Sequence, residues 1–318
     1  MQRYPATRLL ASLFLPFLVV GLLTTAARAT PFTVLEGPVP GFVEPFGINN
    51  RGEIVGQFFE TGGVPFGPQP FLIDAQGQFH IVDLPNVFAT HDNTARDINN
   101  RGDIVGEIRF PGGFTQNTGF GYVLSRNGSL TIFQAPGAIS TAATAINDRG
   151  EIAGNFTDSN GFGHLFLRHR DGTFTTFEGS GVLGLNNRGD VLVFGNGSFL
   201  RDRQGHFTAI DAPGVSGINN RGQIVGSVGL GVEHIVGFVR KPDGAFSFFD
   251  APGSSVTVFT AINDRDVVAG IFFGEPSAEG FVASLDRLNA TPEPATLLLF
   301  GTTATGLGVA AWRRRRRK

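Results

Sequence analysis

The stretch that decides the fold is Asn49-Asn50-Arg51-Gly52-Glu53-Ile54-Val55-Gly56. Variants of this phrase begin at five further positions, which are Asn99, Asn147, Asn186, Asn219 and Asn263. Successive starts are separated by 33 to 50 residues, so residues 32–290 form a repeat array with loops of uneven length. The phrase therefore predicts a repeat fold rather than a single irregular domain.

Each copy of the phrase predicts a β-hairpin. An Ile or Leu ends one strand, Asn-Asn/Asp-Arg-Gly forms the turn, and an apolar, mostly β-branched run starts the next strand. Asn and Gly tolerate the positive φ that such turns require. Copy four has Val193 in place of the last Gly, and copy six has Asp266 at the turn Gly. We expect distortion at these two copies.

A second pair of strands follows each hairpin, as in residues 71–83. Four short strands per unit of about 43 residues is the size of a β-propeller blade. We predict an all-β, six-bladed β-propeller-like repeat domain over residues 30–290, with a β-solenoid or an open sandwich as alternatives. The first strand, at residues 32–35, should pair with the last, at residues 280–285, and close the ring.

Composition supports strands and limits the chemistry. The chain has 318 residues with 45 Gly, 32 Phe and no Cys, and 16% of its residues are charged. A helical bundle, a disulfide scaffold and a Cys-ligated metal site are excluded. Phe79, Phe174, Phe207 and Phe246 are expected to pack between blades.

The N-terminus resembles a secretory signal. Residues 1–29 contain Arg3 and Arg8, an apolar stretch and then Ala27-Arg28-Ala29, which predicts cleavage by signal peptidase after Ala29. A retained N-terminal anchor is the alternative.

The C-terminus has three parts within residues 291–318. Pro292-Glu293-Pro294 precedes an uncharged segment, 295–312, and six basic residues, 313–318. This order predicts a short transmembrane helix whose basic end stays in the cytoplasm. A plain membrane anchor is the alternative to a sorting signal.

Two family resemblances rest on these residues. The tail resembles the PEP-CTERM sorting signal of Gram-negative, exopolysaccharide-producing bacteria, which implies recognition at Pro292, Glu293 and Pro294 by an exosortase and transient residence in the inner membrane. The repeated phrase resembles the HAF family of extracellular repeats, which implies export but no particular activity.

Charge changes when both ends are removed. Residues 1–29 hold three Arg and the tail holds six basic residues and Glu293, which leaves 16 basic against 26 acidic side chains. A domain with a net charge of about −10 is not expected to bind nucleic acid.

One Arg recurs in every turn, and in a closed ring all six would lie on one face. They are Arg51, Arg101, Arg149, Arg188, Arg221 and Arg265. Such a ring is a candidate site for the carboxylates or sulfates of an acidic glycan. The alternative is that each Arg is neutralised by the acid two residues later.

No complete catalytic or metal site is recognised. Residues 97–104 are similar to a calcium loop, but Arg101 and Ile108 occupy ligand positions, and the six His form no metal-binding pattern. We therefore expect no cofactor and no enzymatic activity. The function predicted is an exported surface or matrix protein that acts as a structural or binding module, with exopolysaccharide as its candidate partner. A secreted glycan-active enzyme is the alternative.

Overall fold

The computed structural model describes residues 32–61, 68–85, 93–110, 118–231, 234–274 and 278–288. These residues form 24 strands and a single four-residue helix, α1 (Leu285–Leu288). Within them, no helix is long and apolar enough to cross a membrane. The expected signal peptide and the expected transmembrane segment 295–312 both lie outside the described residues.

Four sheets are separate, four-stranded and antiparallel, and each is a meander of consecutive strands. The first contains β2 (Gly41–Ile48), β3 (Ile54–Glu60), β4 (Gln69–Ile73) and β5 (Phe79–Ile81). The second contains β6 (Asn93–Ile98), β7 (Ile104–Phe110), β8 (Thr118–Leu124) and β9 (Leu130–Phe133). The third contains β10 (Ala138–Ile146), β11 (Ile152–Asp158), β12 (Gly163–Arg168) and β13 (Phe174–Phe177). The fourth contains β14 (Gly181–Leu185), β15 (Val191–Gly195), β16 (Gly197–Arg201) and β17 (Phe207–Ile210).

The remaining eight strands form one sheet rather than two. They are β18 (Val215–Ile218), β19 (Ile224–Gly229), β20 (Ile235–Arg240), β21 (Phe246–Phe249), β22 (Val256–Ile262), β23 (Val267–Phe273), β24 (Ala278–Ser284) and β1 (Phe32–Leu35). A parallel contact between Ile235 and Val256 joins β20 to β22, and the Ile235 amide donates to the Ser255 carbonyl at 2.9 Å. The fold is therefore all-β and propeller-like, but the expectation of six separate blades is corrected to four four-stranded sheets and one eight-stranded sheet.

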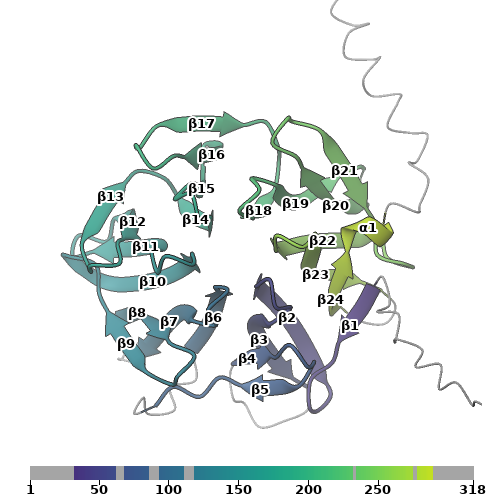
Figure 1. The fold of residues 1–318 in the computed structure, drawn as a ribbon, viewed down its shortest axis with the longest axis horizontal. Helices are drawn as coiled ribbons and strands as arrows, with labels where there is room; N and C mark the ends of the chain where they lie inside the picture. The colour runs from purple at the N-terminus through teal and green to yellow at the C-terminus, as the bar shows by residue number, and fades with distance from the viewer. Residues whose placement is uncertain are drawn as a thin grey trace, which may run out of the picture. The chain divides into compact units, whose positions relative to one another are not determined.

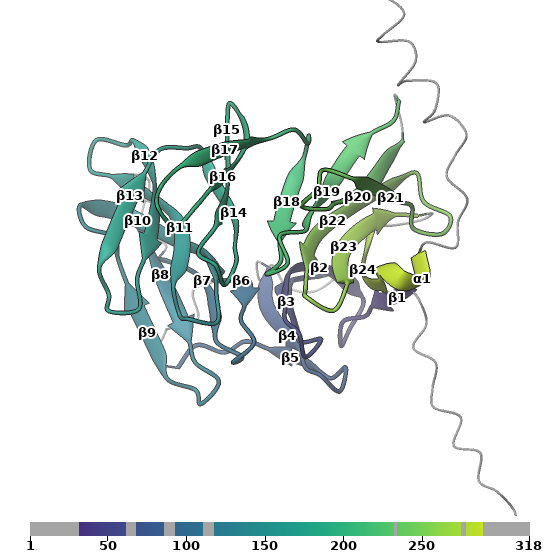
Figure 2. The ribbon, with the colours of Figure 1, turned by 45° about the horizontal axis from the view of Figure 1, so that its top comes forward.

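The first and last strands pair as the sequence predicted. β1 lies antiparallel to β24, with Phe32 opposite Ala283 and Leu35 opposite Gly280, and Figures 1 and 2 show the two strands side by side. The Phe32 ring stacks on Phe281 at 4.8 Å between centroids and meets Phe272 edge-on at 5.3 Å. The N-terminal strand thus completes the sheet that the C-terminal strands begin.

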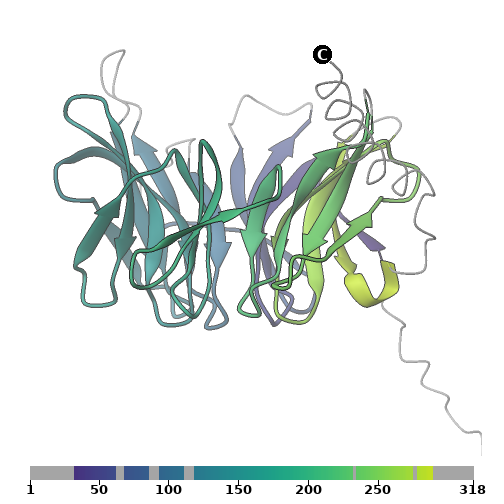
Figure 3. The ribbon, with the colours of Figure 1, turned by 90° about the horizontal axis from the view of Figure 1, so that it is seen from above.

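The innermost strands β2, β6, β10, β14, β18 and β22 surround a central axis (Figure 1). Seen edge-on in Figure 3, the strands run between the two faces of this ring. Each innermost strand ends at a copy of the repeated phrase, so the phrase turns share one face around the axis. In these turns, the amide of the first Asn donates to the carbonyl of the residue four positions later, at 3.0 to 3.1 Å.

The core lies between neighbouring sheets and is built on a glycine–aromatic pairing. The last Gly of the phrase lies opposite an aromatic residue of the third strand, as Gly106 does opposite Tyr122. A Cβ on Gly106 would come within 1.8 Å of the Thr94 carbonyl oxygen and 2.8 Å of the Tyr122 ring. The buried aromatic residues of this layer are Phe71, Tyr122, Phe166, Phe238 and Phe281.

The expectation that the fourth-strand Phe residues form the core is only partly met. Phe79 and Phe174 are half-buried and pack on the rings of Phe71 and Phe166. Phe207 and Phe246 are exposed. The prediction placed the packed aromatic residues in the fourth strand of each unit. The aromatic residues that lie opposite the glycines are in the third strand.

Copy four keeps a regular turn, which corrects the distortion expected there, whereas copy six, within the described residues, keeps the bonds of its first Asn without the amide-to-carbonyl turn bond of the other five copies. In copy six, Asp266 adopts φ 58°, the left-handed conformation that Gly adopts elsewhere, and the Asn263 side chain still accepts from Val267 at 3.0 Å. In copy four, Val193 is buried opposite Phe199. The substitution in copy four therefore changes packing without breaking the turn.

Candidate functional site

The first Asn of each phrase is a buried structural side chain. The Asn147 Oδ1 atom accepts the amides of Arg149 and Glu151, at 3.0 and 3.1 Å. Its Nδ2 donates to the Glu151 carboxylate at 2.7 Å and to the Asn186 carbonyl of the next sheet at 3.1 Å. The same bond between neighbouring sheets is made by Asn49, Asn99 and Asn263, while Asn219 makes it to Asn263 within the eight-stranded sheet. These side chains cap their own turns, and those of Asn49, Asn99, Asn147 and Asn263 also join their sheet to the next.

The second position of each phrase forms a closed hydrogen-bonded ring around the axis. The backbone amide of each residue donates to the side-chain oxygen of the next, at 2.5 to 2.8 Å. In order, the ring contains Asn50, Asn100, Asp148, Asn187, Asn220 and Asp264. The last member donates to the first, because the Asp264 amide bonds to the Asn50 Oδ1 atom at 2.8 Å.

The two Asp residues of this ring each accept from both neighbours. Asp148 Oδ2 accepts the side-chain amides of Asn100 and Asn187 at 2.8 and 2.6 Å. Asp264 Oδ2 accepts those of Asn50 and Asn220, both at 2.8 Å. Burial alone would raise the pKa of Asp148, but the bonds from Asn187 and Asn100 hold it below its ordinary value. Both carboxylates are thus used inside the ring.

The predicted Arg residues lie in the turns, and four of them bind the acid two positions later. The ion pairs are Arg51–Glu53 at 2.5 Å, Arg101–Asp103 at 2.7 Å, Arg149–Glu151 at 2.6 Å and Arg188–Asp190 at 2.8 Å. Arg221 binds Gln223 and Asp266, and the Arg265 amide donates to Asn263. This geometry matches the neutralised alternative, while glycan binding by the ring stays a prediction.

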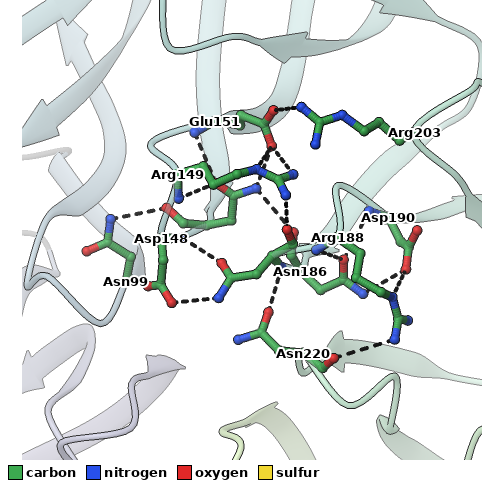
Figure 4. Close-up of polar contacts among 11 residues, drawn as sticks. Asn99, Asp148, Arg149, Glu151, Asn186, Arg188, Asp190, Arg203 and Asn220 are labelled. Carbon is green, nitrogen blue, oxygen red and sulfur yellow. Dashed lines mark hydrogen bonds and ion pairs between the residues drawn. The ribbon is translucent and has the colours of Figure 1, made fainter.

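Several of these Arg residues also reach the next sheet. Arg149 donates to the carbonyl of Asn187 and Arg188 to that of Asn220 (Figure 4). The buried Glu151 carboxylate is held from a second side by Arg203 at 3.1 Å. Burial raises the pKa of Glu151, but hydrogen bonds from Arg149 and Asn147 lower it below its ordinary value overall. Most charges of the turns are therefore paired within the network.

The central channel contains a second candidate site, which the sequence analysis missed. A polar cavity of about 70 Å³ lies among the Asn and Asp turns. A neighbouring cavity of about 60 Å³ lies between the innermost strands, and Asp97 lines both. Arg96, Phe46 and Thr144 also line the second cavity.

A β-bulge explains how neighbouring residues of one strand both reach this channel. Every innermost strand has a register shift at the same place, which in β6 lies between Ala95 and Asp97. A bulge inserts an extra residue and re-aims the side chains beside it. Arg96 is that extra residue, and so it lines the cavity together with Asp97.

Arg96 and Asp97 have distinct environments. The Arg96 guanidinium lies over the Phe46 ring, 4.8 Å from its centroid. The two carboxylate oxygens of Asp97 accept the amides of Ile98 and Ile146, at 2.8 and 2.9 Å. Burial raises the pKa of Asp97 to about 7, against the lowering effect of these bonds.

The remaining predictions concern the processing sites and metal binding. Ala27, Ala29, Pro292, Glu293 and Pro294 lie outside the described residues. Within the described ranges, no group of three or more His, Asp or Glu side chains is placed to hold a metal ion. Asp97, the first residue of the loop compared with a calcium site, uses its oxygens to bind backbone amides.

Comparisons with known proteins identify the tail and little else. Residues 290–317 match the PEP-CTERM protein-sorting motif. No curated protein matches the chain.

Similar solved structures include three enzymes. A gluconolactonase from Xanthomonas campestris is 10% identical, with 79% of this chain and 88% of that chain covered and a TM-score of 0.49. Puromycin hydrolase is 15% identical, with 79% of this chain and 43% of that chain covered and a TM-score of 0.46. Trypanosoma rangeli sialidase is 13% identical, with 79% of this chain and 56% of that chain covered and a TM-score of 0.48. At these identities and scores, the likeness carries no argument about activity.

Proposed function

We propose that this protein is exported, sorted at its C-terminus by an exosortase, and serves at the cell surface or in the extracellular matrix as a structural or exopolysaccharide-binding module. The single observation that carries the proposal is the PEP-CTERM motif at residues 290–317. Pro292, Glu293 and Pro294 are the residues that the sorting enzyme would read. Signal peptidase would remove residues 1–29. The resemblance of the repeats to HAF-type extracellular repeats also agrees with export.

The turn face supports a structural role. Its Asn, Asp and Arg side chains bind one another across neighbouring sheets, as in the bonds from Asn147 to Asn186 and from Asn50 to Asp264. Polar groups satisfied in this way rigidify a fold. The Arg side chains are still about one-third to one-half exposed, for example 46% for Arg101. Contact with an acidic glycan would therefore add to a framework that is already complete.

A glycan-active enzyme is the second candidate, and one observation favours it. Asp97 lines both channel cavities, and burial raises its pKa to about 7, a value that suits a general acid or base at neutral pH. A glycosidase would require a second carboxylate at a fixed separation. An assay of the native secreted protein for new reducing ends on the host polysaccharide would decide between the two candidates, since a module releases none.

The sorting proposal is tested in the native host by replacing Pro292, Glu293 and Pro294 with alanine. We expect the variant to retain its tail and stay in the membrane fraction, while the parent protein loses the tail and leaves the membrane. A matched variant with Thr302 and Thr303 replaced by alanine should be processed like the parent. Equal processing of the alanine-motif variant and the parent would refute the proposal.

A further inference from the structure

The two channel positions created by the bulge are charged in only one of the six innermost strands. The equivalent pairs are Phe46-Gly47, Thr144-Ala145, Leu183-Gly184, Ser216-Gly217 and Thr260-Ala261, against Arg96-Asp97 in β6. At these two positions the other five strands are therefore uncharged. A repeat framework needs no charge at this place, so the exception calls for a separate explanation.

The space around Asp97 is shaped for it. A Cβ on Gly47, in the neighbouring strand β2, would come within 2.8 Å of both the Asp97 Cα and its Oδ1. The carboxylate is then fixed by the Ile98 and Ile146 amides rather than by Arg96. These contacts orient Asp97, and its carboxylate makes no ion pair with the Arg96 guanidinium.

Arg96 is half-buried and stacks on Phe46. Among the described residues, no ion pair or hydrogen bond is made by its guanidinium. Burial lowers the pKa of Arg96, the charge of Glu107 opposes that effect, the charge of Arg109 adds to it, and the charge of Glu44 opposes it. Glu107 is itself bound by Arg109 at 3.0 Å. Arg96 thus presents its fork of donors to a cavity.

We propose that the channel is a binding site for a single carboxylate group, which the Arg96 guanidinium holds above the Phe46 ring. The planar fork of an Arg matches a carboxylate in a bidentate pair. A cavity of about 60 Å³ accepts such a group and leaves the rest of the ligand outside the innermost strands. Asp97 lines the same cavity, and its carboxylate repels a doubly charged phosphate more strongly than a monoanion. The ligand class is a small organic acid or the carboxylate of a sugar acid.

This site is independent of the sorting proposal, because it lies between the innermost strands and not in the turns or the tail. Its failure would leave the sorting proposal unchanged. Mutation of the six turn Arg residues tests glycan binding at the turns, whereas mutation of Arg96 in β6 tests binding in the channel.

The test is calorimetric titration of the native secreted protein with sodium glucuronate, with sodium acetate and neutral glucose as comparison ligands. We expect saturable binding of one glucuronate, with glucose at least about tenfold weaker. Binding of both acids would assign the site to any carboxylate, and binding of glucuronate alone would assign it to sugar acids.

Arg96→Gln should weaken glucuronate binding by at least about tenfold. Arg96→Lys keeps the charge but loses the planar fork, so its affinity for glucuronate should lie between those of the parent and Arg96→Gln. Arg170→Gln removes the same charge from an exposed outer turn and should bind like the parent. Equal affinity of Arg96→Gln and the parent would overturn the proposal, as would equal binding of glucose. A lack of saturable binding by the parent up to about 100 mM acid would also overturn it.

Discussion

Replacing Asn147 by alanine tests whether the phrase turns hold the sheets together. The change removes two bonds accepted from the Arg149 and Glu151 amides and two donated, to the Glu151 carboxylate and the Asn186 carbonyl. A neutral hydrogen bond contributes about 1 kcal/mol net, and one to a charged group contributes more. Because Asn147 is 3% exposed, water replaces these bonds poorly. We expect a loss of about 4 kcal/mol in the free energy of unfolding.

The assay is urea unfolding followed by circular dichroism, with Asn127→Ala as the matched control. Asn127 is also a turn residue, but it is exposed and accepts a single bond, from the Ser129 amide at 3.0 Å. Its replacement should cost less than about 1 kcal/mol. Similar losses for Asn147→Ala and Asn127→Ala would refute the reasoning, because burial and contact between sheets would then add nothing.

Three further predictions concern packing, closure and titration. Gly106→Ala should destabilise the fold by about 3 kcal/mol, since its Cβ meets a backbone oxygen at 1.8 Å, whereas Gly163→Ala, with nothing within 4 Å, should change stability by less than about 0.5 kcal/mol in the same urea assay. Phe32→Ala should cost about 2 kcal/mol and speed proteolysis of the closing sheet, while Val34→Ala, on an exposed side chain of the same strand, should have little effect. Burial raises the pKa of Asp97 from 3.8 to about 7, so the ionisation of Asp97 destabilises the folded state as the pH rises through that range. Between pH 5 and 8, the free energy of unfolding of the parent should therefore fall by at most about 3 kcal/mol relative to that of Asp97→Asn. Parallel pH profiles of the free energy of unfolding for the two proteins would contradict this.

The turns could be predicted because they depend on local chemistry, and the closure could be predicted because the two ends of the repeat array match. Asn and Gly at fixed positions predicted the hairpins, and the match between the two ends of the repeat array predicted the β1–β24 pair. The ion pairs of Arg51 and Arg149 with the acids two residues later also followed from spacing. In contrast, the merger of two strand groups depends on one contact near Ile235, which no sequence pattern indicates.

The channel site could not be predicted because it depends on a bulge. Strict alternation would place Arg96 and Asp97 on opposite faces of β6, and only the register shift lets both line the cavity. A signal was nevertheless present in the sequence. Aligning the residues just before Ile48, Ile98 and their four equivalents shows that the second copy alone is charged at both positions. The ring of Asn50 and its equivalents was likewise visible as a repeat, but its closure across sheets required the fold.

The central claim is that this is a sorted surface module, and the measurement that tests it most directly is mass spectrometry of both ends of the native protein. Host cells with and without exopolysaccharide are fractionated, and the protein is recovered from each fraction. We predict an N-terminus near Thr30, a C-terminus near Pro292, and retention at the surface that is lost when the polysaccharide is absent. An intact tail in the membrane fraction, with the same distribution in both strains, would contradict the account.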